Sequence, residues 1–205
     1  WNERARKADP DKITSRMAWR AIVKALPKDA IISSDIGNSC ALGAAYPTFE
    51  EGRKFLAPGM FGPCGYGFPS IIGAKIAKPD TPVVGFAGDG AFGISMNEMT
   101  AISRKEWPAI TMIIFRNFHW GAEKRNSTLW YHDNFVGTEL NRDVSYAAIA
   151  KACGVEGVQA TSMDDLTEKL NTAVKAQMEN GVTTFIEVMT NMELGEPFRR
   201  DAMKK

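Results

Sequence analysis

The sequence is poor in the residues that build disulfide frameworks and zinc sites. Its 205 residues include three cysteines, Cys40, Cys64 and Cys153, which lie far apart and form no Cys-x-x-Cys pair. A small secreted fold held by disulfides is therefore excluded, and we expect reduced thiols in a cytoplasmic protein. The two histidines, His119 and His132, have no cysteine or carboxylate at zinc-ligand spacing, which argues against a zinc centre.

A large charge of one sign and long apolar runs are also missing. The chain has 25 basic and 24 acidic residues, a net charge of +1, which argues against a nucleic-acid or polybasic membrane surface. No apolar stretch approaches the length of a bilayer span. The Gly-x-Ser-x-Gly motif of serine hydrolases is absent. What remains is the composition of one soluble globular domain, with 44% apolar and 24% charged residues.

Apolar segments of strand and helix length alternate along the whole chain. Strands are predicted at Ala30–Asp35, Lys54–Ala57, Val83–Ala87, Ile110–Phe115, Val155–Ala160 and Thr183–Thr190. Helices are predicted at Asp9–Leu26, Ala41–Ala45, Phe68–Lys78, Ser95–Ile102, Tyr146–Cys153 and Asp164–Glu179. This alternation predicts an α/β fold, a mostly parallel sheet of about six strands with helices on both faces. The two runs without polar alternation, Val83–Ala87 and Ile110–Phe115, should be the central strands.

Two helix starts are predicted from local signals. Asp9 followed by Pro10 has the pattern of an N-cap with proline in the first turn, so the first helix should begin there. Ser95 and Glu98 have the spacing of a capping box, which predicts that the next helix begins at Ser95.

The chain divides into three segments by composition. Residues 1–8 are polar and are interpreted as a linker, residues 9–190 as the domain, and residues 191–205 as a polar tail. The chain starts at Trp1 without an initiator methionine or a secretory leader. We therefore expect it to be part of a longer polypeptide.

Polar residues follow two of the apolar strands at their carboxyl ends. Gly88-Asp89-Gly90 follows one strand, and Asn117 follows the next. In parallel sheets ligands bind beyond these ends, where Asn38 is also expected. A carboxylate and an amide oxygen suit a hard cation such as Mg²⁺, and a glycine-rich turn leading into a helix adds N–H donors for an anion. The combination predicts a bound diphosphate.

Other interpretations of these residues stay open. Gly88–Gly93 matches Gly-x-Gly-x-x-Gly, the signature of a dinucleotide turn. Asp89 would repel a pyrophosphate there unless a cation intervened, and the following strand lacks the acidic residue that binds ribose. Asp89 alone could also be an ordinary Asp-Gly turn residue, and Asn117 an ordinary cap.

These residues resemble the C-terminal, diphosphate-binding domain of thiamine diphosphate enzymes. That family carries Gly-Asp-Gly and, some 25 to 30 residues later, Asn or Asn-Asn; here Arg116 stands in the place of the first Asn. The resemblance implies that Mg²⁺ is held by Asp89, Asn117 and the main-chain carbonyl of His119.

Further stretches resemble the acetolactate synthase-like branch of this superfamily. They are Asp35–Asn38, Gly62–Pro69 and Ser95–Met99. Cys64 takes the place of a bulky apolar residue that supports the bent cofactor in that branch. The resemblance implies cofactor contacts from Gly37, Asn38, Ser39, Pro63, Cys64, Gly88, Gly90, Ala91, Trp120, Gly121 and Ala122.

The segments after Asn117, together with the tail, are most similar to the sulfoacetaldehyde acetyltransferase family. They are Trp120–Asn126, Leu129–Tyr131, Asn134–Leu140 and Glu193–Met203. The resemblance implies conversion of sulfoacetaldehyde and phosphate to acetyl phosphate and sulfite. Because both substrates are anions, Arg116, Lys124, Arg199 and Arg200 are candidate clamps, among which the sequence does not choose.

The same resemblance implies that this chain holds only part of an active site. The glutamate that activates the cofactor belongs to an N-terminal domain contributed by a neighbouring subunit, in a homodimer or homotetramer. The chain alone contains no catalytic residue on this interpretation and should be inactive. Two alternatives remain: another carboligase or 2-oxoacid decarboxylase such as acetolactate synthase, and a non-catalytic cofactor-binding domain.

Overall fold

The computed structural model describes Glu3, Lys7 and residues 9–49, 52, 54–104 and 106–194. Most of the expected linker, residues 1–8, and most of the expected tail, residues 191–205, therefore lie outside the described residues. Within the described part of the chain, no helix combines the length and apolar character needed to cross a membrane.

Six strands form one sheet, in which every pair of neighbouring strands is parallel. Their order is β2-β1-β3-β4-β6-β5. The strands are β1 (Ile31–Ser34), β2 (Phe55–Leu56), β3 (Val83–Gly88), β4 (Thr111–Arg116), β5 (Glu156–Ala160) and β6 (Thr184–Met189). The predicted α/β class is confirmed, and β3 and β4 lie in the middle of the sheet as their unbroken apolar runs predicted.

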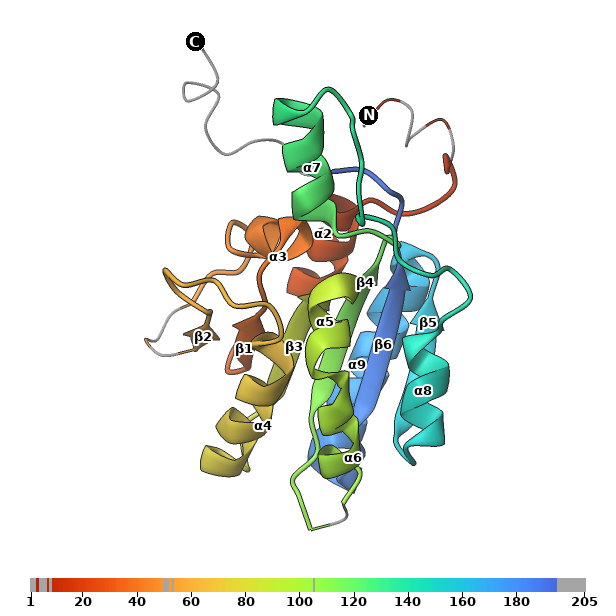
Figure 1. The fold of residues 1–205 in the computed structure, drawn as a ribbon. Helices are drawn as coiled ribbons and strands as arrows, with labels where there is room; N and C mark the ends of the chain where they lie inside the picture. The colour runs from red at the N-terminus through yellow and green to blue at the C-terminus, as the bar shows by residue number, and fades with distance from the viewer. Residues whose placement is uncertain are drawn as a thin grey trace.

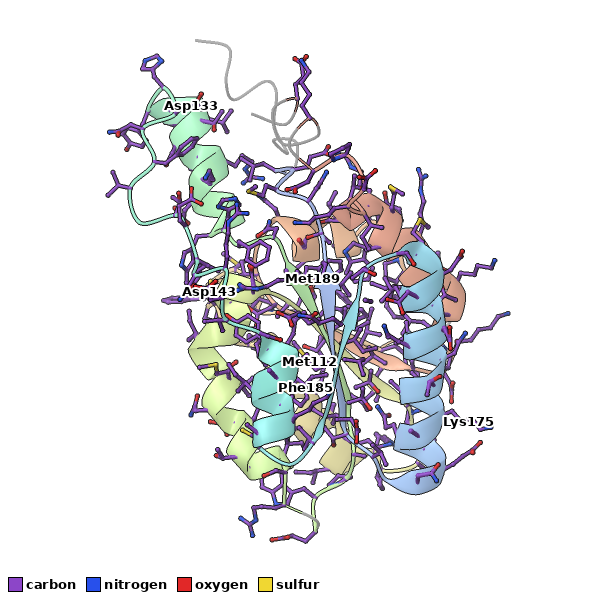
Figure 2. The ribbon with its side chains drawn as sticks, turned by 90° about the vertical axis from the view of Figure 1, so that its right-hand side faces the viewer. Met112, Asp133, Asp143, Lys175, Phe185 and Met189 are labelled. Carbon is purple, nitrogen blue, oxygen red and sulfur yellow. The ribbon has the colours of Figure 1, made fainter. Side chains whose placement is uncertain are left out.

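Helices cover both faces of this sheet (Figure 1). They are α2 (Ser15–Ala25), α3 (Asn38–Gly43), α4 (Gly67–Ala77), α5 (Asp89–Ser95), the short 3₁₀ helix η1 (Met96–Glu98), α6 (Met99–Ile102), α7 (Gly121–Trp130), α8 (Tyr146–Ala152) and α9 (Met163–Asn180). Helices α2 and α9 pack on one face, and α4, α5, α6 and α8 pack on the other. Figure 2 shows α9, which carries Lys175, on one side of the sheet.

The two apolar cores follow from the alternation of side chains along the central strands. In β3, Val84 and Phe86 belong to the layer beneath α2 and α9, while Val83 and Ala87 belong to the opposite layer. Met112 and Phe185, both labelled in Figure 2, belong to that opposite layer. Because both faces are buried, these strands need apolar side chains at every position, which is the pattern that the sequence displays.

The helix start predicted at Asp9 is wrong, and the capping box predicted at Ser95 does not form. Helix α2 begins at Ser15 and is capped by Thr14, whose hydroxyl accepts a hydrogen bond from Met17 N at 3.1 Å. Ile13 forms a parallel bridge with Thr190, and Asp9 begins only a turn, in which Lys12 N donates to the Asp9 carbonyl.

Ser95 is the last residue of α5 and the residue before η1, but its side chain makes no capping hydrogen bond. The helix begins at Asp89, directly after β3, so the capping signal lies at the far end of a helix that has already formed. Ser95 Oγ is buried and has no hydrogen-bond partner among the described residues. Met99 and Ile102, in α6, are buried.

Trp19 fixes the position of α3 against the sheet. Its ring is fully buried and lies 4.5 Å from the Phe86 ring and 5.6 Å from the Phe115 ring, measured between centroids. Its Nε1 donates to the main-chain oxygen of Ser39 at 2.6 Å. Gly43 packs so closely on the indole that a Cβ there would overlap it. These contacts hold the first turn of α3, with Asn38, at the carboxyl end of β1.

Candidate functional site

A pocket of about 170 Å³ lies at the carboxyl ends of β1, β3 and β4, the edge that parallel sheets use for ligands. Figure 1 shows α3 and α7 at this end of the sheet. The lining residues are Ile36, Gly37, Asn38, Ser39, Gly62, Cys64, Gly88, Asp89, Gly90, Ala91, Phe115, Asn117, His119, Trp120, Gly121, Ala122 and Glu123. All of the residues that the sequence singled out for cofactor or metal line this pocket, except Pro63.

Asp89 lies at the back of the pocket and is 1% exposed. Its Oδ2 accepts three hydrogen bonds, from Phe118 N at 2.7 Å, Asn117 N at 3.1 Å and Arg116 Nη1 at 3.1 Å. Its Oδ1 accepts one, from Gly90 N at 3.0 Å. Oδ1 is therefore the oxygen with acceptor capacity left for a ligand.

Burial dominates the electrostatics of this carboxyl group. It raises the pKa of Asp89 to about 6, although Arg116 and the N–H groups of Phe118 and Gly90 act in the opposite direction. A second positive charge nearby would stabilise the charged form of this buried carboxylate. The first of these opposing influences, Arg116, comes from the neighbouring strand β4.

The turn after β4 carries Asn117 and His119 to the same place. Phe118, at its centre, has a left-handed backbone with φ of 66°, which is unusual for a residue other than glycine. This conformation lets two successive N–H groups, those of Asn117 and Phe118, point at one oxygen of Asp89. Asn117 Oδ1 accepts a hydrogen bond from His119 N at 3.1 Å, which fixes the amide with its oxygen on the inner side of the turn.

Arg116 is committed to the protein interior. Besides Asp89, its Nη2 donates to the main-chain oxygens of Asn141 at 2.6 Å and Val144 at 2.9 Å. Its Nε lies 3.4 Å from Glu187 Oε1, an ion pair without hydrogen-bond geometry. The side chain is 1% exposed and does not line the pocket. The expectation that it could clamp an anionic substrate is not supported by this position.

Lys124 is likewise engaged beside the pocket. It pairs with Glu139, whose other oxygen lies 2.7 Å from His119 Nδ1. Burial lowers the pKa of His119 to about 4, and the neighbouring Lys124 adds to the effect. The imidazole is therefore neutral at neutral pH. This cluster joins α7 to the segment around Glu139, and the two segments are also linked by the bond from Trp120 N to Thr138 O at 2.9 Å.

The opposite wall of the pocket depends on Asp35. Its Oδ1 accepts from Ile36 N at 2.8 Å and Gly65 N at 3.0 Å, and its Oδ2 accepts from Gly67 N at 2.7 Å. These bonds hold the loop that carries Cys64 against the end of β1. Burial raises the pKa of the Cys64 thiol, and the charge of Asp35 adds to this, so the thiol is protonated at neutral pH.

Comparison with known families identifies the domain that carries this pocket. The family described as "Thiamine pyrophosphate enzyme, C-terminal TPP binding domain" matches residues 35–188. The chain belongs to this family. The matched residues begin at Asp35 and include all the residues that line the pocket.

Relatives of this TPP-binding domain are longer proteins. The sulfoacetaldehyde acetyltransferase of Roseovarius nubinhibens is 71% identical over 205 residues, which are 100% of this chain and 34% of that protein. A probable acetolactate synthase large subunit from Methanocaldococcus jannaschii is 33% identical over 147 residues, 72% of this chain and 25% of that protein. The chain thus spans about a third of the length of the first relative and matches the second only distantly.

A solved structure resembles the TPP-binding domain in fold. It is the thiamine diphosphate-dependent 4-hydroxybenzoylformate decarboxylase of Rhodococcus jostii RHA1, with a TM-score of 0.77 and 23% sequence identity. The likeness covers 88% of this chain and 33% of that chain. At this identity it supports the architecture alone.

The pocket of the TPP-binding domain fits a diphosphate that is bridged by a cation. Asn38 Nδ2 is buried and has no hydrogen-bond partner among the described residues, so a donor faces the pocket unused. A Cβ at Gly121 would lie 3.3 Å from this nitrogen, and glycine keeps the space open. The lining residues include Asp89 and Glu123 but no lysine or arginine. An anion at this place therefore needs a bound cation to offset the carboxylates.

A cation would find oxygen ligands rather than a cluster of charged side chains. Among the described residues, no group of three or more His, Cys, Asp or Glu side chains could hold a metal ion. The expected ligands are one carboxylate, one amide and one main-chain carbonyl, which such a cluster would not include. Oxygen sets of this kind suit Mg²⁺, which keeps several waters and takes few protein ligands.

Sequence reasoning missed several residues around the site. Three of them, Ile36, Gly62 and Glu123, line the pocket and lie inside the quoted motifs. The motif residues next to them were a sufficient signal to predict their place. Glu187 was missed although a carboxylate in the apolar strand β6 was visible in the sequence. A buried charge needs a partner, and this one signals a network behind the site. The candidate clamps Arg199 and Arg200 lie outside the described residues.

Proposed function

We propose that the protein containing this domain is a thiamine diphosphate- and Mg²⁺-dependent sulfoacetaldehyde acetyltransferase. The observation that carries the proposal is the 71% identity to such an enzyme over the whole chain. The reaction would convert sulfoacetaldehyde and phosphate to acetyl phosphate and sulfite. The acetolactate synthase alternative has weaker support, since the identity is 33% over 72% of the chain.

The role of this domain would be to hold the diphosphate. Asp89 Oδ1, Asn117 Oδ1 and the His119 carbonyl would bind Mg²⁺, and the Asn38 amide would donate to a phosphate oxygen. Three hydrogen bonds on Asp89 Oδ2 hold the carboxylate in one orientation, so no rearrangement is needed when the cation binds. Fixed ligand groups of this kind reduce the free-energy cost of binding.

The size of the pocket supports a divided site. Pockets for drug-sized ligands have volumes of roughly 300 to 1,000 Å³, whereas this one has about 170 Å³. It would accommodate the diphosphate end of the cofactor and leave the rings to other surfaces. We propose that the N-terminal domain of a neighbouring subunit supplies them, in a cytoplasmic homodimer or homotetramer, and that this chain alone does not turn over substrate.

The chemistry divides between cofactor and protein. Thiamine diphosphate, when bound, supplies an electron sink for the acyl carbon. The residues of this chain bind and orient it: Asp89 and Asn117 through the cation, and the Cys64 loop from the opposite wall. The protonated thiol of Cys64 is not a nucleophile, so its role would be packing.

The test is turnover by the complete protein. With Mg²⁺, thiamine diphosphate, phosphate and sulfoacetaldehyde we expect sulfite and acetyl phosphate in equal amounts, since one carbon–sulfur bond is broken for each acetyl group transferred. Omission of phosphate should abolish acetyl phosphate. Formation of acetolactate from pyruvate, without sulfite release from sulfoacetaldehyde, would instead establish the acetolactate synthase alternative.

A further inference from the structure

Glu187 is a buried carboxylate behind the pocket, on strand β6. It is 1% exposed and does not line the pocket. Its Oε2 accepts from Ser145 Oγ and Gln159 Nε2, each at 2.9 Å, and the N–H groups of Tyr146 and Ala147 lie at 3.3 Å from its oxygens. These donors hold the carboxylate in one place. A buried charge inside an apolar strand requires a partner of opposite charge.

That partner is Arg116, which lies between two carboxylates. Its Nη1 is 3.1 Å from Asp89 Oδ2 and its Nε is 3.4 Å from Glu187 Oε1. The side chains of Arg116, Asp89 and Glu187 are each no more than 2% exposed. The guanidinium also lies 4.3 Å from the Phe118 ring centre and 5.1 Å from that of Tyr146, so ring faces enclose it.

Tyr146 joins the same network from α8. Its hydroxyl donates to the main-chain oxygen of Asp89 at 2.9 Å, while its N–H lies at 3.3 Å from Glu187. The start of α8 therefore contacts both ends of the charged row. The row is part of the protein's framework at the place where β3, β4, β6 and α8 meet.

The charges in this row decide how the site responds to a cation. One positive and two negative groups give the row a net charge of −1. Without Glu187 the net charge would be zero, and a cation at Asp89 would face the guanidinium of Arg116 with no compensation. Interactions between charges are strong in such a dry interior, because little water screens them.

We propose that Arg116 and Glu187 are positioning residues that act on the cation site through their charges: Glu187 cancels the charge that Arg116 would otherwise exert on a cation at Asp89. This inference rests on the proposed function, because it assumes that Asp89 binds Mg²⁺.

The experiment uses the complete protein and three variants. They are Glu187→Gln, Arg116→Gln and the double variant with both changes. Arg142→Gln is the matched control, since Arg142 lies 5.3 Å from the same Phe118 ring but is exposed. Thiamine diphosphate binding is measured by calorimetry at a series of Mg²⁺ concentrations, and the melting temperature is measured in EDTA and in saturating Mg²⁺.

Each variant has its own expected result. Glu187→Gln should raise the Mg²⁺ concentration for half-maximal cofactor binding at least about tenfold, because the guanidinium is no longer neutralised. Arg116→Gln should destabilise the protein in EDTA, and Mg²⁺ should then raise its melting temperature by more than in the wild type. The double variant restores a net charge of −1. Its half-saturating Mg²⁺ concentration should return to within about threefold of the wild-type value.

A purely structural role gives a different pattern. In that case each single variant would lose the same stability in EDTA and in Mg²⁺, the double variant would be worse than either, and Glu187→Gln would need no more Mg²⁺ than Arg142→Gln. Any of these results overturns the inference. If Glu187→Gln does not fold, Arg116→Gln decides alone, since an unchanged gain in melting temperature from Mg²⁺ contradicts the proposed charge balance.

Asp89→Asn separates this inference from the proposed function. If Asp89→Asn retains the wild-type Mg²⁺ dependence, the cation site itself is wrongly assigned. If Asp89→Asn loses Mg²⁺-dependent binding while the Arg116 and Glu187 variants behave like Arg142→Gln, the site stands and only the positioning role fails.

Discussion

Two buried aspartates occupy equivalent places in the sheet and differ in what they hold. Asp35 follows β1 and Asp89 follows the adjacent strand β3, with 3% and 1% exposure respectively. Asp35 spends both oxygens on main-chain N–H groups of its own turn and the Cys64 loop. Asp89 also pairs with the guanidinium of Arg116, and unlike Asp35 it lines the pocket. The topology supplies the position, and the surrounding donors decide whether the carboxylate serves the fold or a ligand.

Burial sets the direction of both pKa values. It is the largest influence on Asp35 and on Asp89, and it raises both pKa values despite several hydrogen bonds to each group. For Asp89 a cation would oppose this effect, whereas Asp35 has only its N–H partners. An aspartate-to-asparagine substitution should therefore affect cofactor binding and stability differently at the two positions.

The largest expected effect is on cofactor binding by Asp89→Asn in the complete protein. Loss of the carboxylate charge removes the main attraction for Mg²⁺, so the affinity for thiamine diphosphate should fall by at least about a hundredfold. Asp35→Asn should keep its Mg²⁺ dependence. Calorimetric titration of both variants measures this, and equal losses would remove the distinction between the two aspartates.

The next effect is on the stability of the protein, through the loop that Asp35 holds. An asparagine there has one acceptor oxygen, so at least one of the three N–H donors from Ile36, Gly65 and Gly67 loses its bond. A buried unsatisfied donor costs about 1 to 3 kcal/mol. The free energy of unfolding in urea, measured without Mg²⁺, should fall by about this amount. Unchanged stability would mean that the Cys64 loop is held by other contacts.

Sequence reasoning worked best where one physical cause dominates. The unbroken apolar runs of β3 and β4 can be buried only in the middle of a parallel sheet, and their carboxyl ends then place Asp89 and Asn117 together. The motif residues around the pocket followed from the resemblance. These features depend on local sequence or on a rule of topology.

It failed where contacts between distant segments decide the structure. The helix predicted to start at Asp9 begins at Ser15 instead, because Ile13 pairs with Thr190. Arg116 was one of four candidate clamps for an anion, but its partners are Asp89 and Glu187, which come from two other segments. The partner of a buried charge is not encoded next to it in the chain.

Asp165 sharpens the comparison from outside the core, with the smallest expected effect. It accepts from Thr161 N at 2.9 Å, as Asp35 accepts from main-chain groups, but it lies at the surface of α9 beside Lys169. The hydrogen bond from Lys169 is the main cause of its lowered pKa, followed by that from Thr161. Main-chain bonds thus accompany a raised pKa in the core and a lowered pKa at the surface.

The two groups should give pH dependences of opposite sign. The folded-state pKa of Asp35 lies above its ordinary value of 3.8, so the folded protein binds the proton more tightly, and this group's contribution to stability decreases as pH rises from 3.8 through the raised pKa. Asp165 has a folded-state pKa below 3.8, so its contribution is complete above 3.8 and is lost as pH falls through the lower value. Unfolding free energies of the wild type, Asp35→Asn and Asp165→Asn, compared between about pH 3 and pH 6, separate the two contributions. The Asp165 difference should stay within about 1 kcal/mol, because water screens this partly exposed pair. If both differences change in the same direction with pH, burial is not what distinguishes these carboxylates.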